Sequence, residues 1–537
     1  MRHHRLDALR TNELFDILVI GGGATGCGIA VDAATRGLKV ALVERNDFAE
    51  GTSSRSTKMV HGGVRYLEAA IKRLDKAQYT LVREGLHERG AFLRNAPHLS
   101  NRVPLVTPLY SWMEVPYVFA GLKLYDLLAG SQNIGHSSLI SRAEALRRFP
   151  FLKADGLKAG VVYYDGQFVD ARMAIALAKT AEDAGAAVAN HVAVTALIHD
   201  TDRRVAGAEV EDRLTGDRWT IRARAVINAT GPYADAICRM DDPAAQPILK
   251  VSSGIHIVLD KRFVPPDTGM LIPKTDDGRV LFILPWQGHA LIGTTDEPAT
   301  VSEHPKPEAA DIAYLLNHIR RYFNVAVSES DIKSVWSGIR PLVFDPKAKD
   351  TSQLARDHVI IESMSGLVTI SGGKWTTYRL MSEQAVDRAI SVAHLSPVRP
   401  CCTHHLKLWG GAGYREDGDR VLVRDYGLEA DVARHLNRIY GDRASDVAAL
   451  AASGAGARLH PAHPYIEAEV LYAVREEAAV HAADVLVRRM TLAHVDRPAA
   501  LAALPRVVAI MTDALGWSDH DREVEESRAR ERLEEAI

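Results

Sequence analysis

The chain opens with an ordered succession of apolar and polar stretches. An apolar run over residues 17–20 leads into a glycine-rich turn, helical spacing follows, and a second apolar run covers residues 40–43. The glycines have the spacing G-x-G-x-x-G and are Gly21, Gly23 and Gly26. The pattern predicts a strand, a tight turn, a helix and a second parallel strand, which together form a βαβ unit.

The glycine spacing has a chemical explanation. Glycines allow the turn to be tight and let its backbone approach a pyrophosphate, whose charge then lies at the N-terminus of the helix. Glu44 follows the second strand, where a carboxylate can accept hydrogen bonds from ribose hydroxyls and disfavours a 2′-phosphate. The stretch therefore predicts a dinucleotide site, with an ordinary tight turn as the alternative. It leaves NAD and FAD open.

Two later segments repeat this logic and favour FAD. Residues 225–231, AVINATG, predict an apolar strand that returns to the dinucleotide. Residues 366–378, GLVTISGGKWTTY, predict a strand, paired glycines and a helix that starts near Trp375. A helix N-terminus at this place can stabilise the negative charge that a flavin gains on reduction.

Residues 50–68, EGTSSRSTKMVHGGVRYLE, are rich in hydroxyl groups, glycines and basic side chains. Such a segment rarely packs in a core, because its donors need acceptors, which a phosphate and a flavin ring would supply. The alternative is a solvated loop. The glycines of the opening turn and Glu44 are thus predicted to bind the cofactor. Further predicted cofactor contacts come from this segment and from residues 225–231 and 366–378: Thr52, Ser53, Ser54, Lys58, His61, Gly62, Gly63, Gly231, Gly373, Lys374 and Thr376.

The remaining pattern predicts how the chain is divided. Strand-like alternation between Lys250 and Asp345 indicates an antiparallel sheet, and the chain beyond Pro400 has helical spacing. We expect an α/β fold: a Rossmann-like FAD-binding domain of the glutathione-reductase type, an antiparallel-sheet substrate domain and a C-terminal all-α domain. The predicted boundaries are 1–398 for the FAD-binding domain, with an interleaved capping domain mainly at 67–225 and 240–345, and 399–537 for the helices.

Composition narrows the classes of function. The chain has 65 basic and 68 acidic residues among 537, so it carries no nucleic-acid signature. The four cysteines show no disulfide spacing, and the adjacent Cys401 and Cys402 match no zinc spacing, so no metal site is expected. The N-terminus lacks the apolar core of a secretory signal, and no stretch reaches the apolar length of a spanning helix. We expect a soluble or peripheral protein.

Residues 108–130, PLYSWMEVPYVFAGLKLYDLLAG, form the most apolar and aromatic segment of the chain. Aromatic side chains and Lys123 at the edge of an apolar helix are typical of an interfacial membrane contact. A helical hairpin packed on its own domain explains the same pattern. The sequence leaves both interpretations open.

Several motifs together resemble one family. They are GGGATGCG, SSRSTKMVHGGVRYLE, INATGPYAD, SSGIHIVL, LPWQGHALIGTTD, SGIRPL and SGGKWTTYR. Their combination resembles the respiratory FAD-dependent sn-glycerol-3-phosphate dehydrogenases over nearly the whole chain. The sequence shows no mitochondrial transit peptide and no EF-hand pattern, so it resembles the bacterial form.

The resemblance implies an activity and a location. It implies oxidation of sn-glycerol 3-phosphate to dihydroxyacetone phosphate, with hydride transfer to noncovalent FAD and electrons passed to a membrane quinone. The expected location is cytoplasmic and peripheral, on the inner face of the cell membrane, and a homodimer is compatible with this interpretation. A soluble glycerol-3-phosphate oxidase that uses oxygen is the alternative, and a non-catalytic flavin-fold scaffold is a third.

The chemistry of the substrate selects candidate site residues within these motifs. The substrate is a dianion, so its pocket needs cations. The candidates for substrate binding are Arg65, Tyr66, Thr294, Arg356 and Lys374, and Arg340 is expected to act on phosphate or hydroxyl.

Loss of hydride from C2 also requires removal of the hydroxyl proton. His256 is the predicted base, because an imidazole titrates near neutral pH and its motif lies in the substrate sheet. A histidine that is merely paired within a strand is the alternative. Arg340 could instead polarise the hydroxyl.

Overall fold

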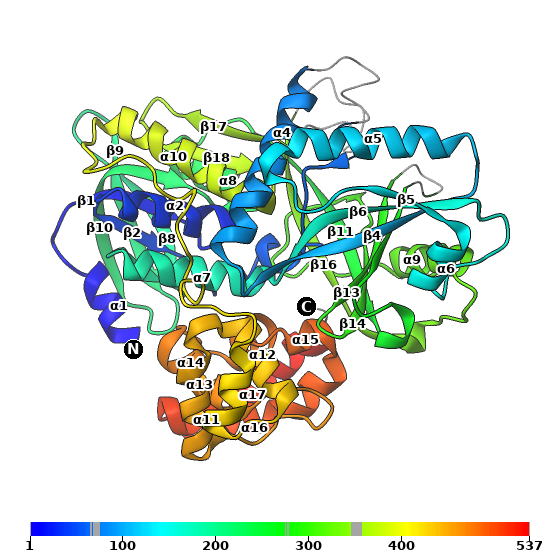
Figure 1. Ribbon diagram of the computed structural model, residues 1–537. Helices are drawn as coiled ribbons and strands as arrows, with labels where there is room; N and C mark the ends of the chain where they lie inside the picture. Colours follow the sequence, from blue (N-terminus) through cyan, green and yellow to red (C-terminus); the bar gives the residue numbers. More distant parts are fainter. Residues whose placement is uncertain are drawn as a thin grey trace.

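Two β-sheets and a block of C-terminal helices make up the structure (Figure 1). The computed structural model describes residues 2–64, 67, 76–273, 275, 279–344 and 357–535. Helices α2, α7 and α10 pack together against one face of the first sheet, α5 runs across the second, and the helices after residue 410 lie together on one side (Figure 1).

The first sheet contains the predicted βαβ unit. Its strand order is β17-β18-β10-β1-β2-β7, and β1 pairs in parallel with both β2 and β10. Ile17 stands opposite Val40 on one side and Ala225 on the other. The strands are β1 (Phe15–Ile20), β2 (Val40–Val43), β7 (Ala187–Ala189), β8 (Val192–His199), β9 (Val205–Asp212), β10 (Arg218–Asn228), β17 (His358–Glu362) and β18 (Val368–Gly372).

Helices cover this sheet because their apolar faces match its buried strands. Helix α2 (Ala24–Thr35) packs between α7 (Asp170–Asp183) and α10 (Tyr378–Ala393). Their side chains share one core cluster with β1, β2 and β18. Every residue of β2 is buried, as expected for a strand covered on both faces.

The second sheet carries the predicted antiparallel strands. Its order is β15-β11-β14-β13-β12-β4-β6-β3, with β16 on β11 and β5 on β6. Its pairs are antiparallel apart from β12 with β4. The strands are β3 (Met59–Val60), β4 (Ser100–Leu109), β5 (Ser138–Ser141), β6 (Ala159–Phe168), β11 (Leu249–Leu259), β12 (Gly269–Ile272), β13 (Leu281–Trp286), β14 (His289–Gly293), β15 (Glu297–Pro298) and β16 (Ile332–Val343).

The sheets interleave along the chain in a different way from the predicted boundaries. The predicted capping segment 67–225 contributes β4, β5 and β6 to the second sheet, but β7 to β10 pair within the first. The pattern did not separate these strands, because alternation is the same in both sheets. The division into domains remains a prediction.

The other helices before residue 400 fill the edges of these sheets. Helix α5 lies beside α4 and against β6. Tyr125 on its inner face is buried in the core cluster of the second sheet. These helices are α1 (Arg2–Leu9), α4 (Lys76–Asn95), α5 (Glu114–Ala129), α6 (Arg142–Arg148), α8 (Ala234–Asp241) and α9 (Ala309–Tyr322).

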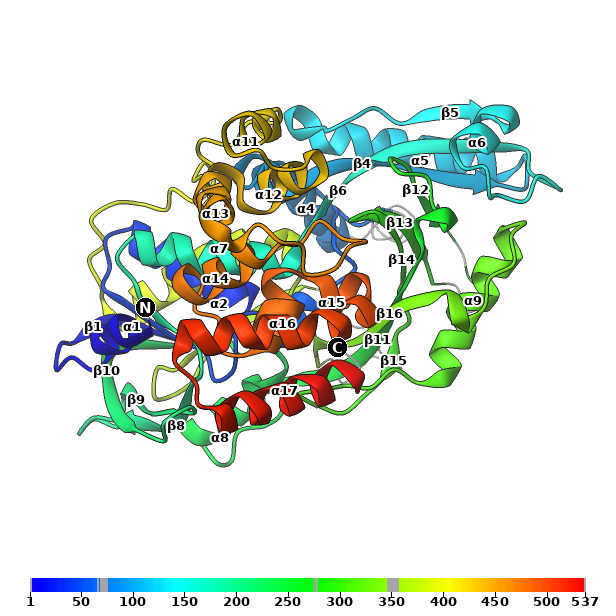
Figure 2. The same cartoon turned by 90° about the horizontal axis from the view of Figure 1, so that it is seen from below.

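The C-terminal helices lie across the junction of the two sheets. Figure 2 shows α14, α16 and α17 between the first sheet and strands β11 and β16. Ser334 of β16 donates to the backbone oxygen of Ala493 (2.8 Å), and Arg172 of α7 pairs with Glu477 (2.6 Å). The helices are α11 (Gly418–Tyr426), α12 (Ala430–Tyr440), α13 (Ala444–Leu450), α14 (Glu467–Glu476), α15 (Leu492–Val495), α16 (Arg497–Leu515) and α17 (Asp519–Glu534).

Helix α16 corrects one expectation from the sequence. It is long and apolar enough to cross a membrane by length and composition, whereas no such stretch was expected. Ala503, Leu504 and Val507 are nevertheless buried in the core cluster that α16 shares with the second sheet. Its apolar character is thus explained by packing inside the protein.

Candidate active site

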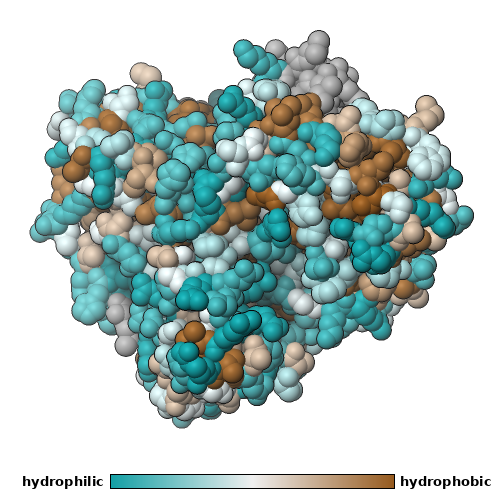
Figure 3. Space-filling view, viewed as in Figure 1, coloured by the Kyte–Doolittle hydropathy of each residue, from teal (hydrophilic) through white to brown (hydrophobic). Residues whose placement is uncertain are grey.

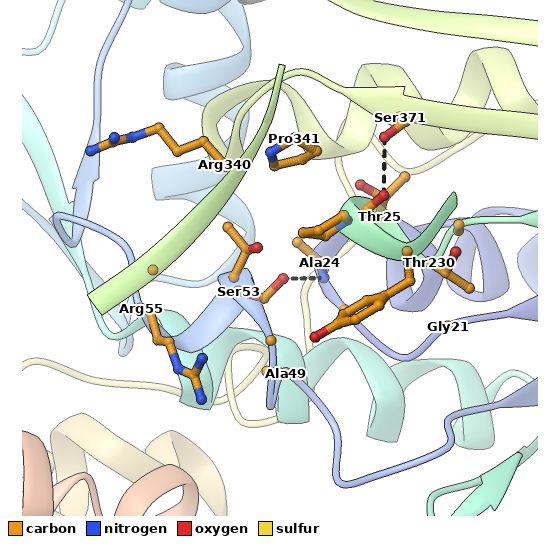
Figure 4. Close-up of a pocket in the computed structure, with 18 of the residues that line it drawn as sticks. Gly21, Ala24, Thr25, Ala49, Ser53, Arg55, Thr230, Arg340, Pro341 and Ser371 are labelled. Atoms are coloured by element: carbon orange, nitrogen blue, oxygen red, sulfur yellow. Dashed lines mark hydrogen bonds between the residues drawn. The ribbon is translucent and has the colours of Figure 1, made fainter. Parts of the chain in front are cut away.

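A single elongated cavity of about 420 Å³ joins the glycine turn to the second sheet. Its walls come from the ends of β1, β10 and β18, the segment 49–61, and strands β11 and β16. Figure 4 shows Gly21, Ala24 and Thr25 at one side of this cavity and Arg340 at the other. The first and the last predicted motifs therefore meet at one place.

The glycine turn has the geometry that a pyrophosphate requires. Gly21 has φ +111°, and a Cβ on Gly26 would lie 1.8 Å from the backbone oxygen of Gly21. Helix α2 begins at Ala24, whose amide donates to Ser53 Oγ (2.9 Å), the bond drawn in Figure 4. Bare backbone at a helix N-terminus with a hydroxyl beside it suits a phosphate.

Glu44 lies at the edge of the same turn. Its carboxylate accepts hydrogen bonds from the amides of Gly22 (2.6 Å) and Asn46 (2.9 Å). Burial raises the pKa of Glu44 above its ordinary value, although the two amide bonds oppose that shift. Ribose hydroxyl donors at this carboxylate would stabilise its charge, so the residue fits the adenosine end of FAD.

Paired glycines open the opposite wall. Gly372 and Gly373 have φ +83° and +74°, and a Cβ on Gly373 would lie 2.4 Å from Met381 Sδ. After this turn, Trp375 packs against the segment that contains Ser53, and its Nε1 donates to the backbone oxygen of Ser53 (2.9 Å). Lys374 lines the cavity directly before the short helix Trp375–Thr377.

His256 lines the cavity from β11, although it is 2 % exposed. Its Nε2 lies 2.9 Å from Thr57 Oγ1, and its ring stacks on Trp336 with centroids 5.4 Å apart. Burial, followed by the charges of Arg340 and Lys58, lowers the pKa of His256 well below its ordinary value. The imidazole is therefore neutral at physiological pH, which a proton acceptor requires.

Arg340 on β16 is fixed by four acceptors. Its Nη1 donates to Ser253 O (3.1 Å) and Asp296 Oδ1 (3.0 Å). Its Nη2 donates to Thr294 Oγ1 (2.8 Å) and Thr295 O (2.9 Å). The guanidinium is thus held rigidly at the cavity wall, and Thr294 acts by holding it.

The structure separates the predicted site residues into two groups. Those that line the cavity are Gly21, Gly23, Glu44, Thr52, Ser53, His61, Gly231, His256, Arg340, Gly373, Lys374 and Thr376. Those that lie behind its lining are Gly26, Ser54, Lys58, Gly62, Gly63 and Thr294. Arg65, Tyr66 and Arg356 lie outside the described residues, so their predicted roles stay predictions.

Two residues behind the lining have other partners. Lys58 is buried, and its Nζ bonds to both carboxylate oxygens of Asp170 (2.7 Å) and to Ser54 O (2.6 Å). The amide of Gly62 donates to Tyr125 Oη on α5 (2.8 Å). These residues shape the wall from behind, which the sequence pattern could not distinguish from direct contact.

Two residues of the cavity escaped the sequence analysis. Thr57 bonds to His256, and Arg55 is a buried cation whose Nη1 donates to Glu303 O (3.0 Å). Burial lowers the pKa of Arg55 to about 9, and the charge of Arg532 adds to the shift. Both lie in the segment SSRSTK, whose mixture of hydroxyl and basic side chains was the signal for them.

Comparisons with known proteins agree with this geometry. Residues 16–379 match the family described as FAD dependent oxidoreductase, and residues 401–522 match the C-terminal domain of alpha-glycerophosphate oxidase. A probable mitochondrial glycerol-3-phosphate dehydrogenase from Caenorhabditis elegans is 50% identical over 98% of this chain and 74% of its own length. The mitochondrial glycerol-3-phosphate dehydrogenase of Rattus norvegicus is 49% identical over 100% of this chain and 74% of its own length.

A solved structure extends the match to the fold and the cofactor. The glycerol-3-phosphate dehydrogenase from Bacillus halodurans, crystallised with FAD, has a TM-score of 0.81 and 29% identity, and the alignment covers 99% of this chain and 97% of that one. The glycine turn, Glu44 and the segment 49–61 form a cradle that fits FAD. The chain belongs to the FAD-dependent glycerol-3-phosphate dehydrogenases, within the FAD-dependent oxidoreductase family, and its cofactor is FAD.

Proposed function

We propose that this enzyme oxidises sn-glycerol 3-phosphate at C2 and delivers the electrons to a quinone held in a membrane. FAD in the cavity would supply the hydride acceptor. The observation that carries the proposal is the continuity of one cavity from the glycine turn to His256, Arg340 and Lys374. The identity of about half of all residues to glycerol-3-phosphate dehydrogenases supports the choice of substrate.

The cations of the cavity suit a phosphorylated alcohol. Arg55, Arg340 and Lys374 all line it, so an anionic ligand there lies close to three positive side chains. The Nη groups of Arg340 already donate to four protein acceptors, so this residue acts on a ligand through its charge, which Asp296 partly balances. Three cations suit a dianion better than a single carboxylate.

We assign to His256 the role of base, which removes the proton of the C2 hydroxyl. Its lowered pKa keeps the imidazole neutral, so it can accept a proton, although the same shift makes it a weaker base than an ordinary histidine. Thr57 fixes the orientation of the ring through Nε2. Arg340 remains the alternative, since a rigid guanidinium near an alcohol oxygen would favour its alkoxide form.

The oxidase alternative differs in the acceptor. The C-terminal match carries the name of an oxidase, whereas the relatives that match the whole chain are dehydrogenases. Purified holoenzyme with glycerol 3-phosphate should reduce a quinone analogue in detergent and consume little oxygen. Oxygen uptake with stoichiometric peroxide, at the rate of quinone reduction, would favour the oxidase.

A surface along α5 supports contact with a membrane. Trp112, Met113, Tyr117 and Leu127 are 65 %, 87 %, 51 % and 74 % exposed. Brown side chains gather over this helix at the upper right of Figure 3. Trp112 and Met113 lie in the turn before α5, and Tyr117 and Leu127 lie on the helix. Exposed aromatic and apolar side chains on and beside one helix are typical of an interfacial anchor, and a net charge of -3 leaves the apolar contribution dominant.

The membrane contact can be tested by fractionation. Trp112→Ser, Tyr117→Ser and Leu127→Ser together should move the enzyme from the membrane to the soluble fraction, while turnover with a water-soluble dye persists. Phe119 is left unchanged because it packs against the core. A matched control replaces Leu214, Val421 and Val524, which are 40 %, 39 % and 52 % exposed elsewhere and do not line the cavity, by Ser. Equal release by both triple variants would contradict the proposal.

A further inference from the structure

The segment from Glu44 to Ser53, which we call the cofactor loop, follows β2 and ends within the short helix Thr52–Ser54. It forms one wall of the FAD cavity. It is bound to the glycine turn at two points. The carboxylate of Glu44 accepts from the amide of Gly22 (2.6 Å), and the amide of Ala49 donates to Gly22 O (3.0 Å). Any displacement of the cofactor loop therefore also moves the turn that receives the pyrophosphate.

Asp47 belongs to this loop, and its side chain is fully buried and does not line the cavity. Its carboxylate is held by two arginines of the C-terminal helical region. Arg488 Nε lies 2.5 Å from Oδ2, and Arg489 bonds to both oxygens, at 2.6 Å for Nη1 and 2.8 Å for Nη2. Asn190 completes the set with its amide nitrogen 2.9 Å from Oδ1.

The arginines extend the network to other carboxylates. Arg488 Nη2 pairs with Asp484 (2.6 Å) and lies 3.4 Å from Glu50, which is also on the cofactor loop. Arg489 also donates from Nε and Nη2 to the backbone oxygen of Glu477. Two guanidinium groups thus connect two points of the cofactor loop to a turn of the C-terminal region.

The same place contains Asp47, His191 and Asp484 at distances that would allow a metal ion. The carboxylates are already used, however. Both oxygens of Asp47 accept from guanidinium or amide donors, and Asp484 accepts from Arg488 and from the amides of Val480 and His481. A divalent cation would have to displace two buried guanidinium groups, so the cluster is an ion-pair network.

Buried charges of this kind are costly to leave unpaired. Arg489 and Asp47 are 0 % exposed, so loss of Asp47 removes the carboxylate that compensates Arg489, and loss of Arg489 leaves Asp47 with Arg488 and Asn190 as its remaining donors. Either change makes the buried arrangement less favourable, and the cofactor loop can relieve the cost by moving residue 47 toward water. Because the loop is bonded to Gly22, this movement would open the dinucleotide end of the cavity.

We propose that Arg488 and Arg489 are positioning residues for FAD, through which the C-terminal helical region holds the cofactor loop against the glycine turn. The C-terminal region then serves cofactor retention, although it contributes no side chain to the cavity lining among the described residues. The proposal concerns only FAD binding and is independent of the substrate and of the electron acceptor.

The test measures FAD affinity by titrating the apoprotein and following the quenching of flavin fluorescence. Asp47→Asn and Arg489→Met should each weaken FAD binding by at least about tenfold. Because both single changes break the same Asp47–Arg489 pair, the loss in the double variant should be smaller than the product of the two single losses. Arg489→Lys provides a milder variant if Arg489→Met does not fold.

Arg36→Met is the matched control. Arg36 forms a buried ion pair with Asp32 (2.6 Å) at the C-terminal end of α2, and neither residue belongs to the cofactor loop or lines the cavity. This variant should lower the Tm of the apoprotein while its FAD affinity stays within about threefold of the native value. Wild-type FAD affinity in the Asp47 and Arg489 variants would overturn the proposal, as would an equal loss in Arg36→Met.

Discussion

The two ends of the cavity are built by different means. At the dinucleotide end, backbone atoms of consecutive residues create the site: the turn at Gly21, the start of α2 at Ala24 and the amides that bind Glu44. At the substrate end, side chains of separate strands create it. His256 comes from β11 and Arg340 from β16, and strand pairing brings them together.

The difference explains where each end is vulnerable. A site made by backbone fails when a side chain intrudes, and then the cofactor is lost. A site made by side chains fails one interaction at a time, and the cofactor remains. The following substitutions test that contrast.

Gly26→Ala should have the largest effect. Its Cβ would lie 1.8 Å from the backbone oxygen of Gly21, so the turn must shift. We expect the purified variant to lack flavin, with FAD affinity reduced by about 100-fold or more, an effect of roughly 3 kcal/mol. The measurement is the ratio of visible flavin absorbance to protein absorbance after purification.

Gly121→Ala is the control for that change. Gly121 lies in α5, and an added Cβ there meets no atom within 4 Å. This variant should retain full flavin content. If Gly26→Ala retains flavin as well, the backbone account of the dinucleotide end is wrong.

His256→Asn should come second and should spare the cofactor. Removal of a general base typically costs about 10²- to 10⁴-fold in rate. We expect this loss in kcat with a dye acceptor, while the flavin content stays normal. Loss of flavin together with rate would show that the histidine supports the cavity and does not serve the substrate end separately.

Arg340→Met should follow with a smaller loss. The positive charge of the guanidinium should stabilise the bound anion or the developing alkoxide by about 2 to 4 kcal/mol, a roughly 30- to 1,000-fold effect on kcat/KM. The substitution also removes the guanidinium that pairs with Asp296. Asp296→Asn in the same background serves as a control, since recovery of activity there would assign the loss to the charge of Asp296.

The smallest expected effect is on pH dependence. Protonated His256 cannot accept a proton, and its pKa is lowered well below the ordinary value. The fall of kcat/KM with acid should therefore lie below about pH 6.5, and the profile should be flat from there to pH 8. A midpoint of the acid limb above pH 6.5 would be inconsistent with His256 as the base in this environment.

The same contrast separates what the sequence could predict from what it could not. The glycine turn, α2, Glu44 and the strands at 225–231 and 366–378 that lead back to the cofactor were predicted, because each is a contiguous pattern with one geometric solution. Lys58 was assigned to the cofactor, yet it pairs with Asp170 about one hundred residues later, a contact that no local pattern contains. The contact of Thr57 with His256 was missed for the same reason, since the two residues are about two hundred positions apart and meet only in the folded chain.

The most direct measurement is an anaerobic titration of the holoenzyme with glycerol 3-phosphate, followed by visible absorbance. The account predicts that substrate bleaches the flavin spectrum in wild type and in the α5 triple variant, that His256→Asn bleaches more slowly at full flavin content, and that added quinone analogue restores the spectrum. An unchanged spectrum in flavin-loaded wild-type enzyme at saturating substrate would contradict it.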